Sequence, residues 1–119
     1  MKDNILLNKS FNFAIRIVNV YKHLKYKKYE SILSKQLLRS GTSIGANIEE
    51  AIGGQSENDF SSKLSVAYKE APESNYWIKL LANTGYLSNS EAQSLTNDIT
   101  EILKIIGKIQ LTIKSKRNS

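Results

Sequence analysis

The 119-residue chain has no cysteine, one proline and one histidine, and it lacks any long apolar run. Without cysteine it forms neither a disulfide nor a thiolate metal site. Its N-terminal apolar run, Ile5-Leu6-Leu7, is too short for the apolar core of a signal peptide, and no later run approaches the ~20 apolar residues of a membrane-spanning helix. We therefore expect a cytoplasmic protein with no membrane partner.

The sequence also lacks the period-two alternation of Val, Ile and Thr that is typical of a half-buried strand. Its apolar residues recur every three or four positions instead, which is the period of an α-helix. Four helices are expected, at about residues 9–25, 31–52, 57–84 and 89–115. With short polar connections between them, they predict an all-α protein: one domain, residues 1–119, folded as an antiparallel up-down-up-down four-helix bundle.

Each expected helix has one apolar seam that would face the core. In chain order the seams are Ala14, Ile17, Val18, Tyr21 and Leu24; Leu37, Gly41, Ile44, Ile48 and Ala51; Phe60, Leu64, Ala67, Ala71, Ser74 or Asn75, Ile78 and Leu81; and Leu95, Ile99, Ile102, Ile106, Ile109 and Ile113. The last helix has three more apolar residues outside its seam, Leu103, Ile105 and Leu111. A wider core face is one explanation, but we favour a subunit interface, because a monomeric bundle would expose them.

Capping residues indicate where the last two helices begin. Ser88 and Glu91 have the spacing of a capping box at the start of the fourth helix, and Ser56 with Asp59 is a weaker variant at the start of the third. Gly53-Gly54 is expected to end the second helix, because glycine readily adopts the left-handed conformation found at helix C-termini. The basic C-terminal tail after the fourth helix is expected to fray.

Charge is divided unevenly along the chain, whose net charge is +6. Residues 1–47 hold nine Lys or Arg against two acids, residues 48–103 hold three against nine, and residues 104–119 hold five against none. The basic segments would face a nucleic acid in one interpretation. In the other, basic and acidic segments form complementary faces between helices or subunits.

Nine basic residues are candidates for binding RNA or DNA. They are Lys22, Lys25, Lys27, Lys28, Lys35, Arg39, Lys114, Lys116 and Arg117. The first four are interleaved with Tyr21, Tyr26 and Tyr29. Lysine neutralises phosphate, and tyrosine rings stack on unpaired bases, so this stretch is the strongest candidate for nucleic-acid contact. The alternative is a solvated loop whose tyrosines fold over the core.

The segment Gly41-Thr42-Ser43-Ile44-Gly45 fits the G-x-S-x-G pattern of a serine-hydrolase nucleophile elbow. That elbow requires a strand before the serine and a histidine after it. Here the preceding residues have helical periodicity, and His23 comes earlier in the chain. A phosphate-binding loop is excluded as well, because Gly45 is followed by Ala46-Asn47 instead of lysine and a hydroxyl residue. We therefore expect no catalytic residue and no nucleotide cofactor.

Helix packing remains as the role of this segment. An interior glycine costs a helix about 1 kcal/mol relative to alanine, so Gly41 and Gly45 are expected where a neighbour approaches the backbone closely. Together with Ser43 and Asn47 they form the expected packing face, and Thr42, Ser43 and Asn47 are expected to hydrogen-bond across the contact. Either a neighbouring helix or a bulky aromatic side chain would approach there, and the third helix offers the aromatic side chains Tyr68, Tyr76 and Trp77.

Patterns of metal ligands are also lacking. A di-iron bundle uses Glu-x-x-His on two helices, and this chain contains no such pair. His23 has no second histidine and no carboxylate at helical spacing, so we expect no metal site and a polar surface position for His23. The glutamates of the second and third helices are expected to pair with Arg39, Lys63 or Lys69, or to bond to tyrosine hydroxyls. These observations predict a non-enzymatic protein.

Two strings carry a resemblance to a known family. They are QLLRSGTSIGANIEEA, residues 36–51, and SENDFSSKLSVAYKEAPESNYWIKLL, residues 56–81. The chain resembles the bacterial four-helix-bundle family encoded in 23S rRNA intervening sequences, also called S23 ribosomal proteins. The resemblance covers most of the chain. It rests on R-[SA]-x-x-S-I-x-A-N-I-x-E from Arg39 to Glu50, followed by D-F-x-x-K-L-x-x-A and Y-W.

This resemblance implies an antiparallel four-helix bundle that assembles as a homopentamer and has no known catalysis, with an RNA-related role. It also implies kinship with the accessory variability proteins of diversity-generating retroelements, which form a basic pentameric barrel and bind nucleic acid and a reverse transcriptase. The expected partners are therefore further copies of the chain and RNA or DNA. The alternative partner is a basic protein, such as a nucleic-acid enzyme, recruited by the acidic segment 48–103.

One residue departs from the family pattern. Pro72 falls inside the expected third helix, where it removes a backbone hydrogen bond and clashes with the carbonyl group of Tyr68. We predict a bend near Tyr68 to Pro72.

Overall fold

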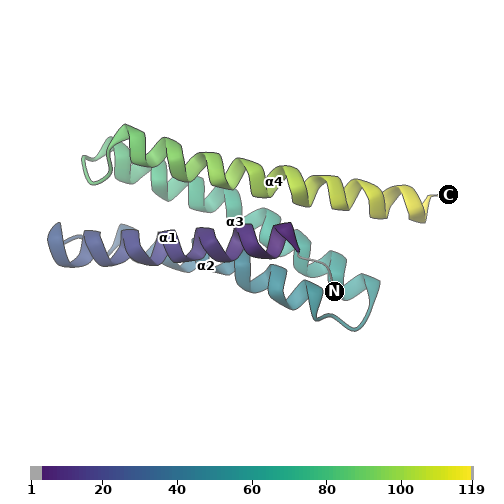
Figure 1. The fold of residues 1–119 in the computed structure, drawn as a ribbon. Helices are drawn as coiled ribbons and strands as arrows, with labels where there is room; N and C mark the ends of the chain where they lie inside the picture. Colours follow the sequence, from purple (N-terminus) through teal and green to yellow (C-terminus); the bar gives the residue numbers. More distant parts are fainter. Residues whose placement is uncertain (1–3, 119) are drawn as a thin grey trace.

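The computed structural model describes residues 4–118, which fold into four helices and no strand (Figure 1). They are α1 (Ile5–Lys27), α2 (Leu33–Ile52), α3 (Glu57–Asn83) and α4 (Asn89–Arg117). Each helix packs against the next, and α1 also packs against α4. The predicted all-α fold is therefore confirmed, and the contacts are those of an up-down bundle, about 52 Å long and 23 Å across.

The core is lined by the apolar seams of the four helices. The seam of α2 is buried at every expected position, and that of α3 at every position except Phe60, which is half-buried. In α1 the buried side chains include Leu6 and Phe13, whereas Ala14, Val18 and Tyr21 are only half-buried. The expected seam of α1 was partly wrong, since only Ile17 and Leu24 of it are buried. The helix also begins at Ile5, four residues earlier than predicted, with Asn4 accepting a hydrogen bond from the Leu7 N–H.

Helix α4 is buried along its first half only. Leu95, Ile99, Ile102 and Ile106 are buried, but Ile109 and Ile113 are half-exposed. Figure 1 shows the reason: the C-terminal part of α4 extends past the start of α1, so no helix covers it on that side. Of the three residues outside the predicted seam, Leu103 and Ile105 pack against the core and Leu111 is 69% exposed.

The predicted caps of the last two helices are confirmed. The Ser56 hydroxyl accepts a hydrogen bond from the Asp59 N–H at 3.0 Å, and Ser88 and Glu91 form a complete capping box. Helix α3 is continuous through Pro72, whose side chain is exposed. The bend near Pro72 stays a prediction. The expected fraying of the tail is not seen in the described residues, since α4 continues to Arg117.

Candidate functional site

One end of the bundle is formed by the last turns of α1 and the connection to α2, at the far left of Figure 1. The side chains of Lys22, Lys25, Lys27 and Lys28 are all exposed there. The Lys25 ammonium lies 5.3 Å from the ring centroid of Tyr26 and 5.8 Å from that of Tyr21. Such distances are those of cation–π contacts. We call this region, residues 21–32, the basic end.

The backbone of the basic end is fixed by two hydrogen-bonding groups. The N–H groups of Lys28 and Glu30 both donate to the Leu24 carbonyl oxygen, at 3.2 and 2.9 Å, and between them Tyr29 has φ 57°, in the left-handed region. The buried Glu30 carboxylate then accepts hydrogen bonds from the N–H group of the N-cap residue of α2 and from those of the first two residues of the helix. These donors are Ile32 at 3.0 Å, Leu33 at 2.9 Å and Ser34 at 2.8 Å.

Burial alone would raise the pKa of Glu30, but these backbone hydrogen bonds and one with the Ser34 side chain outweigh it, so the pKa lies below the ordinary value. Glu30 therefore stays ionised and satisfies the N-terminus of α2. Sequence reasoning missed this cap and placed the helix start at Ser31. The available signal was an acid three residues before Leu33, the first residue of the helix.

Five cations along the body of the bundle form salt bridges. Salt bridges join Lys9 to Glu101, Arg16 to Asp98, Lys63 to Glu50, Arg117 to Glu57, and Arg39 to both Glu70 and Glu73. In the described part of the chain, none involves Lys22, Lys25, Lys27 or Lys28. The acid that influences this end is Glu91: its pKa is lowered mainly by the hydrogen bond from the Ser88 backbone, and also by the positive charges of His23 and Lys28.

The nine basic candidates do not form one surface. Lys35 is exposed in the first turn of α2, close to the basic end in sequence. Arg39, by contrast, is bonded to Glu70 and Glu73, and the Trp77 indole N–H also donates to Glu73 at 3.2 Å. The prediction that Arg39 and Lys63 pair with glutamates is thus confirmed, whereas Lys69 forms no salt bridge with a described residue.

The basic C-terminal residues Lys114, Lys116 and Arg117 lie at the opposite end of the molecule from the basic end (Figure 1). Arg117 donates to the Asn58 side chain at 3.1 Å and pairs with Glu57, at the start of α3. An up-down bundle requires this separation, because α4 runs away from the α1–α2 connection. A single binding surface made of both basic segments of one chain is therefore wrong.

The two glycines of the G-x-S-x-G segment lie against α1, not against aromatic rings of α3. A Cβ atom at Gly41 would be 3.0 Å from Ile17 Cγ1, and one at Gly45 would be 3.2 Å from the carbonyl oxygen of Ser10. Of the two expected neighbours, the helix is confirmed, and the aromatic side chains Tyr68, Tyr76 and Trp77 are wrong. A helical period identifies the face of a helix that carries small residues, but it does not identify the neighbour that packs against that face.

The polar residues beside these glycines bond within their own helix. The Thr42 hydroxyl donates to the Leu38 carbonyl at 2.6 Å, and the Asn47 amide donates to both the carbonyl and the hydroxyl oxygens of Ser43. The predicted hydrogen bonds across the contact are therefore not formed. Ser43 lies inside the continuous helix α2, so the strand-turn-helix geometry of a nucleophile elbow is not formed around it.

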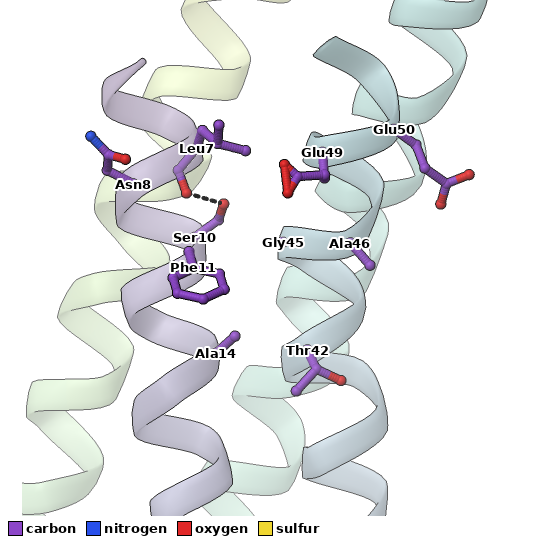
Figure 2. Close-up of a pocket in the computed structure, with 10 residues that line it drawn as sticks. All are labelled: Leu7, Asn8, Ser10, Phe11, Ala14, Thr42, Gly45, Ala46, Glu49 and Glu50. Carbon is purple, nitrogen blue, oxygen red and sulfur yellow. Dashed lines mark hydrogen bonds between the residues drawn. The ribbon is translucent and has the colours of Figure 1, made fainter. Parts of the chain in front are cut away.

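A groove of about 580 Å³ lies between α1 and α2 on their outer side (Figure 2). Its walls are mostly apolar or small, with Leu7, Phe11 and Ala14 from α1 and Gly45 and Ala46 from α2. The Phe11 side chain is 63% exposed. Figure 2 shows the Glu49 carboxylate turned toward α1, whereas Glu50 points away from it. The groove is thus an apolar surface with a negative charge beside it.

Residues 4–118, which the structure describes, contain neither a cluster of metal ligands nor a membrane-spanning helix. No group of three or more His, Asp or Glu side chains in that range is placed to hold a metal ion. No helix there is long and apolar enough to cross a membrane. His23 is exposed on α1, as expected.

Comparisons with known proteins agree with this architecture. Residues 2–108 match the family described as 23S rRNA-intervening sequence protein. A crystal structure at 1.70 Å resolution of a protein of unknown function from the S23 ribosomal protein family of Bacteroides thetaiotaomicron is 50% identical, with a TM-score of 0.86. The match covers 88% of this chain and 97% of that one. Among curated proteins, none matches. The chain belongs to the 23S rRNA-intervening sequence protein family.

Proposed function

We propose that this protein is a non-enzymatic, cytoplasmic nucleic-acid-binding protein that contacts RNA or DNA through its basic end. The observation that carries the proposal is the clustering of four exposed lysines, none in a salt bridge with a described residue, within residues 22–28. Five cations along the bundle are joined to acids, whereas Lys22, Lys25, Lys27 and Lys28 are exposed without a salt bridge to a described residue. Lysines in this state are available to neutralise phosphates and release their counterions.

Self-association is part of the proposal. The resemblance implies a homopentamer, and the outer face of α1 supports a contact between copies, because Ile5 and Phe11 are each 63% exposed. In a ring, every subunit would present one basic end. Once the first end has bound a long nucleic acid, each further contact becomes intramolecular, so weak single contacts add to tight binding.

Binding measured at several salt concentrations tests the nucleic-acid function. We expect log Kd to rise linearly with log salt for a labelled RNA. Replacing Lys22, Lys27 and Lys28 together by alanine should weaken binding and reduce the salt slope by about 2, since each phosphate contact contributes roughly 0.7 to 0.9. A matched control replaces Lys69, Lys104 and Lys108, which are equally exposed on the body of the bundle.

The control has the same net charge as the test variant, so it should keep the wild-type slope and most of the affinity. Equal losses in the two variants would mean that net charge, and not the basic end, attracts the nucleic acid. Absence of binding at low salt would overturn the function itself.

A second candidate is a protein-interaction module that recruits a nucleic-acid enzyme. The groove between α1 and α2 favours it, because an apolar groove flanked by Glu49 suits an amphipathic helix with basic residues. In this case the groove would hold another protein instead of a second copy.

Light scattering separates the two uses of the groove. Replacing Ala46 by arginine would fill the groove and add a positive charge beside Glu49. If the groove joins copies of this chain, the purified wild type should form an oligomer, and the variant should have a lower mass in solution than the wild type. If it holds another protein, the variant should keep the wild-type mass but lose a partner that the wild type captures after nuclease treatment.

A further inference from the structure

The basic end exposes aromatic and apolar side chains beside its lysines. Tyr29 is 90% exposed, Ile32 78% and Tyr26 64%. Side chains of this kind are ordinarily at least partly buried. Here three of them occur between residues 26 and 32, and none is part of the buried core. The end of the bundle therefore offers aromatic faces to the solvent next to ammonium groups.

Tyr29 is unfavourable for folding in two respects. Its φ of 57° lies in the left-handed region, which glycine and asparagine adopt more readily than an aromatic residue. Its exposed ring also adds nothing to the core. The conformation is held on both sides, because the N–H groups of Lys28 and Glu30 both donate to the Leu24 carbonyl oxygen. The left-handed conformation ends α1, as is common for the residue after a helix C-cap, and the ring at this position stays exposed to the solvent.

The lysines are placed to complement these rings. The Lys25 ammonium lies over the faces of Tyr21 and Tyr26, so a positive charge is held beside an aromatic surface. Lys22, Lys27 and Lys28 are exposed on the same turns of the chain. Aromatic faces next to phosphate-neutralising cations are the combination by which proteins hold single-stranded nucleic acids.

A duplex uses such a surface poorly. Its bases are already stacked on one another, and only the phosphates and groove edges reach a protein surface. An unpaired base has a free face that a tyrosine ring can cover.

Resting on the proposed nucleic-acid function, we propose that the basic end selects unpaired nucleotides. The rings of Tyr26 and Tyr29 stack on bases, and Lys22, Lys25, Lys27 and Lys28 bind the flanking phosphates. Single-stranded RNA and single-stranded DNA share this chemistry.

Fluorescence anisotropy with three labelled probes tests the inference on the full chain. The probes are an unstructured RNA of about 12 nucleotides, the DNA of the same sequence, and the RNA annealed to its complement. Wild-type protein should bind at least one single strand about fivefold or more tighter than the duplex, because only the single strand gains stacking. Stronger binding of RNA than of DNA would add a contact to the 2′-hydroxyl and would support the inference equally.

Variants of Tyr29 separate the ring from the backbone. Tyr29→Gly suits the left-handed backbone but has no ring, so it should fold normally and weaken single-strand binding about fivefold or more, with the duplex changed less than about twofold. Tyr29→Phe should keep the wild-type affinity, whereas Tyr29→Leu should lose it. Tyr68→Ala, which removes another exposed tyrosine from the middle of α3, is the control and should bind like wild type.

Two results would overturn the inference in distinguishable ways. The first result is equal binding of duplex and single strand, with no effect of Tyr29→Gly and a loss of binding in the triple lysine variant. In that case the selection of unpaired nucleotides is wrong and the proposed function stands. If no probe binds at low salt, both are wrong.

Discussion

Replacing glycine by alanine at three helical positions separates the effect of helix propensity on stability from the effect of helix packing. A Cβ atom at Gly41 would lie 3.0 Å from Ile17 Cγ1, and one at Gly45 would lie 3.2 Å from the Ser10 carbonyl oxygen. At Gly107 in α4 there is nothing within 4 Å of the added atom. The first two substitutions therefore push α1 away from α2, and the third is a matched control without a neighbour.

The expected magnitudes follow from these distances. Alanine is favoured over glycine in a helix interior by about 1 kcal/mol, so Gly107→Ala should raise the free energy of unfolding by roughly 0.5–1 kcal/mol. At Gly45 the neighbour is backbone, which cannot rotate away, and at Gly41 it is the fully buried, β-branched Ile17. Overpacking of such sites costs about 1–3 kcal/mol. After the gain in propensity, Gly41→Ala and Gly45→Ala should lower the free energy of unfolding by about 0–2 kcal/mol.

Urea denaturation monitored by circular dichroism measures these differences as shifts of the midpoint. All variants must be compared at one protein concentration, because self-association makes the stability of a subunit depend on concentration. The reasoning is refuted if Gly41→Ala or Gly45→Ala stabilises the protein as much as Gly107→Ala. In that case α1 would not approach α2 as closely as the structure has it, and the glycines would need another explanation.

Further predictions concern Glu30, Arg39 and Phe11. Because the pKa of Glu30 is lower in the folded protein, its stabilisation is complete above the ordinary value of 4.5 and is lost as the pH falls through the folded-state value. Glu30→Gln should therefore lower the free energy of unfolding at neutral pH by about 1 kcal/mol. The difference in free energy of unfolding between wild type and variant should become smaller as the pH is lowered. A difference that stays constant with pH would refute the role of Glu30 as a cap. Arg39→Ala, at a largely exposed ion pair, should change stability by less than about 1 kcal/mol and leave RNA affinity unchanged in the anisotropy assay; a large loss of affinity would return Arg39 to the binding surface. Phe11→Glu should reduce the mass measured by light scattering, and an unchanged oligomer would place the subunit contact elsewhere.

The sequence predicted most of the fold because helical periodicity and burial follow each other closely. The seams of α2 and α3 are examples, from Leu37 to Ala51 and from Leu64 to Leu81. The missed start of α1 has a local cause: Asn4 is a good N-cap, but the residues before Lys9 do not repeat with a clear helical period. Glu30 was missed because its three hydrogen bonds depend on the left-handed conformation of Tyr29, which no capping motif encodes.

The candidate site was predicted less completely. Lys22, Lys25, Lys27 and Lys28 were identified by their clustering in the chain, and they are exposed together. The pairing of Arg39 with glutamates was predicted, but which glutamates it meets depends on how α2 and α3 face each other, which periodicity does not determine. The separation of the C-terminal tail from the basic end, however, follows from the up-down topology and was available from the sequence.

The most direct test of the account is to locate the nucleic acid on the protein. A single-stranded RNA carrying 4-thiouridine can be photo-crosslinked to the full chain, and the attached peptides identified by mass spectrometry. The account predicts crosslinks within residues 21–32, with the strongest at Tyr26 or Tyr29. Crosslinks that lie instead in the C-terminal residues 114–117 or along the groove at Phe11 would contradict it.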